Sequence, residues 1–97
     1  MIRFAPEAVD DLARVRDFLD VNSPDAAKRA IATLFAALQR LEDFPNLGRQ
    51  TDDVSIRQIV VPFGSACYVL RYVLGDNGDL LVLRVARSRG TDMSGWR

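Results

Sequence analysis

Residues 66–86 read ACYVLRYVLGDNGDLLVLRVA, and this stretch decides the fold. Two apolar segments rich in β-branched residues, Ala66 to Leu74 and Leu80 to Ala86, flank the tetrad Asp76-Asn77-Gly78-Asp79. Asn-Gly is the pair that type I′ turns favour, because both central residues of that turn need positive φ. The pattern therefore predicts an antiparallel hairpin with Asn77 and Gly78 as its two loop residues.

A two-residue loop also fixes which residues face each other, namely those whose numbers sum to 155. Three apolar pairs then share one face, which we expect to be core: Tyr72 with Leu83, Leu70 with Val85, and Leu74 with Leu81. The opposite face pairs Val73 with Val82, Arg71 with Arg84, and Val69 with Ala86. Because directly opposed arginines repel each other, either they meet carboxylates on a partner chain, which we favour, or the register is shifted by one residue.

Further strands and two helices precede the hairpin. Residues Ile56 to Val61 read as a strand followed by a turn at Pro62 to Ser65, and Ile2 to Phe4 reads as a short opening strand. Pro6 suits a first helical turn, and an apolar stripe runs from there to Leu19.

Ser23 and Pro24 then form an N-cap and first residue for a second helix, which Pro45 ends. The short connection between the helices requires them to be antiparallel. The whole chain, 1–97, thus reads as a single α+β domain in the order β-α-α-β-β-β, with a helical hairpin packed on a small antiparallel sheet.

Composition excludes several kinds of chemistry. The sequence has no histidine and one cysteine, so an imidazole base, any serine or cysteine triad that relies on imidazole, and an internal disulfide are all absent. We expect no cofactor and no metal. No apolar run is long enough to span a membrane and no signal peptide is evident, so we expect a cytoplasmic protein without a membrane partner.

Net charge is zero, but it is unevenly distributed along the chain. Residues 1–53 carry seven basic and ten acidic groups, whereas residues 54–97 carry six basic and three acidic groups. Of the 13 basic residues, all but Lys28 are arginine. Because arginine forms fork-like contacts with carboxylate and phosphate, the second half suits an acidic or phosphate-bearing partner.

Several short motifs follow one another along nearly the whole chain, namely Phe4-Ala5-Pro6-Glu7-Ala8 with Asp11-Leu12, Pro45-x-x-Gly48-Arg49, Arg57, Tyr68-Val69-Leu70-Arg71-Tyr72, and Leu83-Arg84-Val85-Ala86-Arg87-Ser88-Arg89. Their order and spacing resemble the ParE/RelE superfamily of toxins. At Gly48 we weigh a positive φ that ends the preceding helix. For Arg49 we weigh an ion pair with Glu42 or Asp43 against a role in target binding.

The resemblance implies the toxin of a type II toxin–antitoxin system. RelE-like members cut mRNA on the ribosome with clustered Lys and Arg and a C-terminal Tyr, whereas ParE-like members poison DNA gyrase. This sequence departs from the nuclease pattern: Val69 replaces the arginine after the third-strand tyrosine, and Trp96 replaces the terminal tyrosine. We therefore favour a non-catalytic gyrase poison, with an mRNA endonuclease or a non-toxic antitoxin-binding module as alternatives.

The resemblance also implies a ParD-like antitoxin with a DNA-binding N-terminus and a flexible C-terminal segment. No sequence-specific nucleic-acid binding by this chain is expected. Residues expected to bind the antitoxin are Phe35, Leu38, Val69, Arg71, Val73, Val82 and Arg84, with Leu41 beside them in a helical groove. Free edges at the first or last strand are expected to accept an antitoxin strand. Residues expected to bind the target are Arg49, Arg57, Arg87, Arg89, Trp96 and Arg97.

Overall fold

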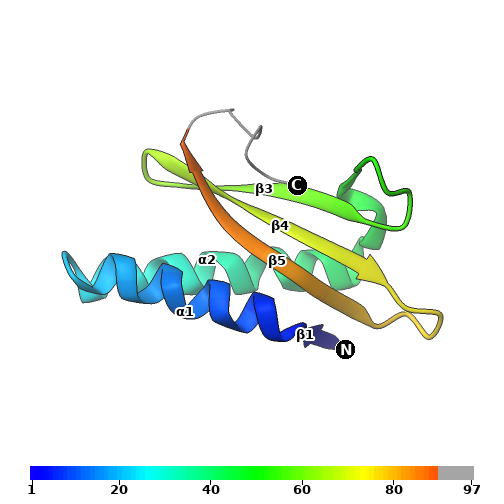
Figure 1. The fold of residues 1–97 in the computed structure, drawn as a ribbon, viewed down its shortest axis with the longest axis horizontal. Coiled ribbons are helices and arrows are strands. Elements are labelled where there is room, and N and C mark those ends of the chain that lie inside the picture. Colours follow the sequence, from blue (N-terminus) through cyan, green and yellow to red (C-terminus); the bar gives the residue numbers. More distant parts are fainter. Residues whose placement is uncertain (90–97) are drawn as a thin grey trace.

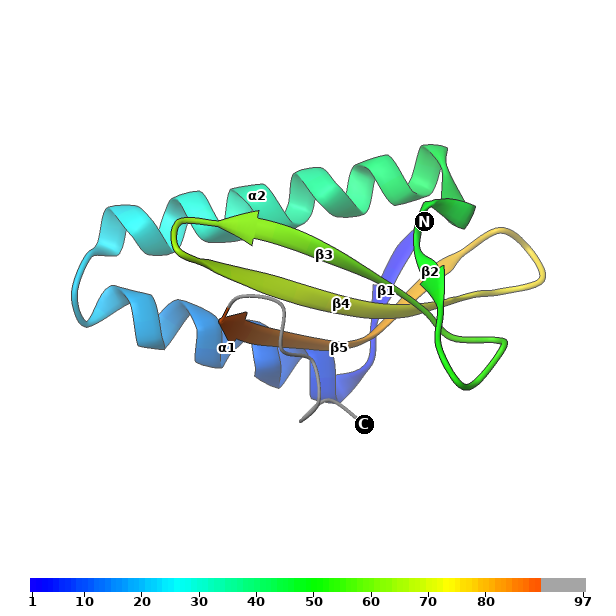
Figure 2. The same ribbon diagram turned by 90° about the horizontal axis from the view of Figure 1, so that it is seen from above.

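Two antiparallel helices lie on one face of a twisted five-stranded sheet in the computed structural model, which describes residues 1–89 (Figure 1, Figure 2). Trp96 and Arg97 lie outside the described residues. Along the chain the elements are β1 (Ile2–Phe4), α1 (Pro6–Asp20), α2 (Pro24–Asp43), the 3-10 turn η1 (Pro45–Leu47), β2 (Arg49–Gln50), β3 (Arg57–Phe63), β4 (Ala66–Leu74) and β5 (Leu80–Arg89). The sheet order is β1-β5-β4-β3-β2.

Both helices begin where the sequence predicts. Pro6 and Pro24 each occupy the first turn, and the Ser23 hydroxyl accepts a hydrogen bond from the Ala26 N–H at 3.2 Å. The buried stripe of α2 faces α1 and the sheet and consists of Ala27, Ala30, Leu34, Ala37, Leu38 and Leu41. No helix within residues 1–89 combines the length and apolarity needed to cross a bilayer.

The predicted α+β class and helical hairpin are confirmed, but the sheet is mixed rather than wholly antiparallel. β1 pairs with β5 in parallel, and β2 adds a two-residue strand against the start of β3. β3 continues through Pro62 to Phe63, so the turn is Gly64-Ser65 alone. Gly64 adopts φ +61°, which suits the first central position of a type II′ turn.

The β4–β5 hairpin is confirmed, whereas its predicted loop is wrong. The loop is Gly75 to Asp79, closed by a 2.7 Å hydrogen bond from the Gly75 N–H to the Asp79 carbonyl. Pairing follows the predicted register from Val69 to Arg71, and the register then shifts between Arg71 and Tyr72. This bulge inserts one residue into β5. The residues of β5 between the bulge and the loop therefore lie on the opposite face of the sheet from the one predicted.

The corrected pairs are Tyr72 with Val82, Val73 with Leu81, and Leu74 with Leu80, in place of the predicted pairs Tyr72–Leu83, Val73–Val82 and Leu74–Leu81. Leu80 and Val82 are consequently buried, whereas Leu81 and Leu83 are only half-buried. The bulge thus decides which face of β5 supplies the core.

The turn at Pro45 to Arg49 is held by β4. The Tyr72 hydroxyl donates to the Pro45 carbonyl at 2.8 Å and accepts from the Gly48 N–H at 2.9 Å. The Arg57 guanidinium donates to the Gly48 carbonyl at 2.7 Å. Arg57 and Tyr72 therefore brace the turn, in place of the ion pair that we considered for Arg49.

Gly48 is required for space and not for backbone conformation. Its φ is −71°, so the positive φ that we weighed is wrong. A Cβ at this position would lie 2.7 Å from Cε1 and 2.9 Å from Cζ of the Tyr72 ring, closer than carbon atoms tolerate. The ring is fully buried and cannot move aside cheaply.

Gly48→Ala is expected to lower the free energy of unfolding by about 2 kcal/mol, because the added methyl overpacks the Tyr72 ring. Urea denaturation followed by circular dichroism measures this change. Gly75→Ala is the matched control, because the nearest atom to its Cβ would be the far end of the Asn77 side chain, at 3.2 Å, and the Asp79 atoms lie at ordinary contact distances of 3.5 and 3.9 Å. Equal losses in the two variants would contradict the steric role of Tyr72.

Candidate functional site

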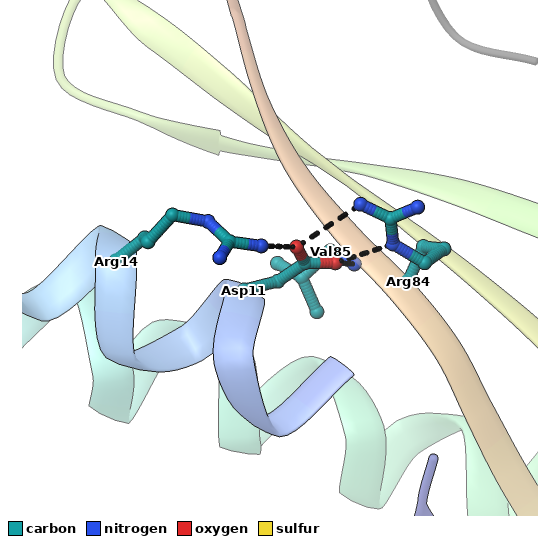
Figure 3. Close-up of polar contacts among 4 residues, drawn as sticks. All are labelled: Asp11, Arg14, Arg84 and Val85. Carbon is teal, nitrogen blue, oxygen red and sulfur yellow. Dashed lines mark hydrogen bonds and ion pairs between the residues drawn. The ribbon is translucent and has the colours of Figure 1, made fainter. Parts of the chain in front are cut away.

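A buried carboxylate joins α1 to β5 (Figure 3). Asp11 is 4% exposed, and Arg84 reaches both of its oxygens, with Nε 2.8 Å from Oδ2 and Nη2 3.2 Å from Oδ1. The Arg14 guanidinium approaches Oδ1 from the opposite side at 2.6 Å. Arg84 therefore finds a carboxylate within the same chain, so the opposition of the two arginines does not require a carboxylate from a partner chain.

Asp11 also accepts a backbone hydrogen bond from β5. The Val85 N–H donates to Oδ2 at 2.9 Å, so the carboxylate takes the place that a neighbouring strand's carbonyl would occupy. Burial raises the pKa of Asp11, but the hydrogen bonds from Arg84, Val85 and Arg14 outweigh burial and hold this pKa below its ordinary value. The carboxylate is thus ionised and fully engaged at neutral pH.

A row of polar side chains crosses the face of the sheet that the helices leave uncovered. The strand registers align Arg49 with Gln58, Gln58 with Arg71, and Arg71 with Arg84. The predicted opposition of Arg71 and Arg84 is therefore confirmed. The two guanidinium groups diverge, because Arg71 Nε donates to Gln58 Oε1 at 3.2 Å while Arg84 turns toward Asp11.

Burial lowers the pKa of Arg71, and the charge of Asp52 opposes that effect. Asp52 lines a polar pocket of about 270 Å³ together with Arg49, Gln58 and Arg71. The row is therefore cationic at its centre and carries an aspartate at each end, Asp52 beside β2 and Asp11 beside β5. Such a bounded surface suits a discrete acidic group better than a long polyanion.

The residues expected to bind the antitoxin are divided between surface and core. Leu38, Val69, Val82 and Leu41 are at most 1% exposed, and the bulge places Val82 on the helix side of the sheet. Phe35 is 42% exposed and stacks edge-on against Phe4 with ring centroids 5.9 Å apart. Val73 and Arg71 are half-buried and Arg84 is exposed. Of the expected set, four residues offer side-chain surface to a partner: Phe35, Arg71, Val73 and Arg84.

Within residues 1–89, the residues expected to bind the target lie at two separate places on the sheet. Arg49 begins β2 and Arg57 begins β3, whereas Arg87 lies on β5 toward the opposite edge of the sheet. Arg57 is committed to the Gly48 carbonyl, and the Arg87 guanidinium stacks 4.8 Å from the centroid of the Phe18 ring. Arg89 ends β5.

The two tyrosine hydroxyls, which are candidates for proton transfer, are both buried. Tyr68 and Tyr72 are at most 1% exposed, and burial raises the pKa of each hydroxyl, partly offset by Arg87 for Tyr68 and by the Gly48 N–H for Tyr72. Among residues 1–89 no group of His, Cys, Asp and Glu side chains is arranged to hold a metal ion.

Sequence reasoning missed the role of Asp11 as the clamp between α1 and β5. A signal was present, because Asp11 falls between Ala8 and Val15 on the buried stripe of α1, where an apolar residue would be expected. It also missed an apolar groove of about 660 Å³ along the outer edge of β3. That groove involves residues distant in sequence and had no local signal.

Comparisons with known proteins agree with this fold. A sequence model described as "ParE toxin of type II toxin-antitoxin system, parDE" matches residues 2–91. Two similar proteins of Caulobacter vibrioides are named Toxin RelE3, 34% identical over 73% of this chain and 76% of that protein, and Toxin RelE2, 35% identical over 80% and 83%. A solved structure titled "Chromosomal ParDE TA system from P. aeruginosa" superposes with TM-score 0.74 and 16% identity, covering 91% of this chain and 95% of the other.

Asp11→Asn is expected to destabilise the fold by about 2 kcal/mol at neutral pH, because the amide replaces one acceptor by a donor facing the guanidinium groups. Asp11 has a lowered pKa in the folded state, so its contribution is complete above about pH 5 and is lost as the pH falls below about 4. The difference between wild type and variant should therefore shrink on acidification.

Urea denaturation at several pH values measures that difference, with Asp10→Asn as the control for an exposed aspartate of the same helix. A difference between wild type and Asp11→Asn that stays constant with pH would contradict the ionised clamp.

Proposed function

The chain belongs to the ParE toxin family of type II toxin–antitoxin systems, and from this premise we propose that it arrests growth by binding and poisoning DNA gyrase, without catalysis of its own. A cognate ParD-like antitoxin neutralises it by covering its surface. We place this activity in the cytoplasm, where gyrase acts. The proposal goes beyond family membership in naming the target.

The observation that carries the proposal is that Tyr68 and Tyr72 are both buried. Cleavage of RNA requires a group that deprotonates a 2′-hydroxyl, and arginine is a poor base. The Tyr72 hydroxyl is hydrogen-bonded to the Pro45 carbonyl and the Gly48 N–H, and Tyr68 is buried beside Arg87. Lys28, the one lysine, lies on α2 in a pocket with Arg16 and Asp20, between the helices and away from the arginine row. These placements support a protein that acts by binding.

An antitoxin partner is supported by the fold shared with a solved ParDE system. We assign antitoxin contact to the exposed members of the expected set, Phe35, Val73, Arg71 and Arg84, with Leu38, Val69 and Val82 supporting them from the core. The names of the Caulobacter relatives favour the alternative, a RelE-type mRNA endonuclease. The two targets leave different products and are separable by experiment.

Purified toxin is expected to inhibit DNA supercoiling by gyrase and to accumulate cleaved plasmid, because a bound poison traps the cut intermediate. An agarose-gel supercoiling assay measures both effects, and toxin premixed with its antitoxin serves as the control. Intact supercoiling together with codon-positioned cuts in ribosome-bound mRNA would replace gyrase by the alternative target. Normal growth on induction without antitoxin would favour a non-toxic binding module.

For the target surface we propose the end of β5 and the residues after it, including Arg87, Arg89, Trp96 and Arg97, with Arg49 as a second contact. Arg87→Ala combined with Arg89→Ala should reduce growth inhibition by at least about tenfold while the fold is retained, since arginine often anchors interfaces. Titration of an inducible promoter against colony counts measures this. Arg29→Ala, on the outer surface of α2, is the control. Undiminished toxicity of the double variant would move the target surface elsewhere.

A further inference from the structure

Both outer strands of the sheet are too short to cover their neighbours. β1 pairs with β5 only at Leu80 to Val82, and β2 pairs with β3 only at Arg57 and Gln58. Each edge of the sheet therefore continues past its outer strand as bare backbone, which is a template for another strand unless something else covers it.

The β5 edge is covered from within the chain. Past Val82 the helix α1 runs alongside β5, and Asp11 accepts the Val85 N–H at 2.9 Å (Figure 3). Further along, Arg87 lies over the Phe18 ring of α1. The last strand, which we expected to accept an antitoxin strand, is thus largely closed to one by its own helix.

The β3 edge differs, because a groove of about 660 Å³ surrounds it. The groove is lined from both faces of β3, by Ile59 and Val61 on the helix side and by Val60 and Pro62 on the open side. Ala37 of α2 and Leu47 of η1 form its outer wall. Val60 is 52% exposed and Leu47 is 51% exposed, so the groove presents apolar surface to solvent.

The backbone of β3 is oriented to use this groove. Phe63 and Ala66 flank the two-residue turn Gly64-Ser65 and form the pair that closes the hairpin. Because hydrogen-bonding direction alternates along an antiparallel strand, the N–H and C=O of Val60 point away from β4, into the groove. Pro62 has no N–H to offer, so the template is short and its register is limited.

The charge of the groove selects the kind of partner. Its lining contains two charged side chains, Arg40 and Arg49, and both are exposed cations. A second copy of this chain paired through β3 would bring these cations together, which disfavours a homodimer. A segment with apolar residues at alternate positions and carboxylates at its ends would fill the groove and meet both arginines.

We infer that the β3 edge binds an acidic, extended segment of a partner protein as an added strand in line with β2. Only the identity of that partner rests on the proposed function, in which it is the antitoxin. Binding of a strand here is independent of whether the target is gyrase or the ribosome, so the two ideas can fail separately.

The test uses two dye-labelled synthetic peptides of about eight residues, each with a core of alternating valine and threonine. One peptide carries glutamates at both ends, and the other carries lysines at both ends. Fluorescence anisotropy should show that the wild-type chain prefers the glutamate peptide by about tenfold. The double variant Arg40→Glu with Arg49→Glu should reverse that preference. Arg16→Glu with Arg29→Glu makes the same change in net charge away from the groove and should leave the preference intact.

Amide hydrogen exchange locates the binding independently of charge. The Val60 N–H should exchange at least about tenfold more slowly when the glutamate peptide is bound, because that amide gains a hydrogen bond. The inference would be overturned if the Arg40→Glu, Arg49→Glu variant and the Arg16→Glu, Arg29→Glu variant showed the same preference between the two peptides. Unchanged exchange of the Val60 N–H on peptide binding would also overturn it. Concentration-dependent dimerisation that protects Val60 without peptide would assign the edge to a second copy and overturn it as well.

Discussion

The ionised carboxylate of Asp11 is the constraint on which the arrangement of the molecule depends. It holds Arg14 and Arg84 and accepts the Val85 N–H, so it fixes α1 against β5 just where β1 ends. A carboxylate buried without these partners would be costly. With them it closes one edge of the sheet, turns Arg84 away from Arg71 and lowers the repulsion between two arginines that face each other across the hairpin.

Closure of the β5 edge leaves the two surfaces that we propose for binding on the remaining sides of the sheet. The uncovered face carries the row Arg49, Gln58, Arg71 and Arg84, and the β3 edge carries an apolar groove that ends in arginines. Both surfaces suit acidic protein segments. The two tyrosine side chains, by contrast, are kept in the core.

The motif Pro45-x-x-Gly48-Arg49 shows how a sequence pattern can be recognised before its cause is known. From sequence, Gly48 suggested a special backbone angle. In the structure its φ is ordinary, and the Tyr72 ring excludes any side chain there. Tyr72 lies 24 residues further along the chain, so no local rule could have identified the reason.

The sequence by itself determined both helices, the three long strands and the β4–β5 hairpin, because apolar periodicity, proline and N-cap residues act between near neighbours. It did not determine the bulge that buries Leu80 and Val82, or the pairing of Asp11 with Arg84 across 73 residues. It also gave no sign of the groove beside β3. These features depend on how the helices and strands pack together. Whether a buried charge or a strand edge is stabilised depends on groups that are distant in sequence and that only folding brings near.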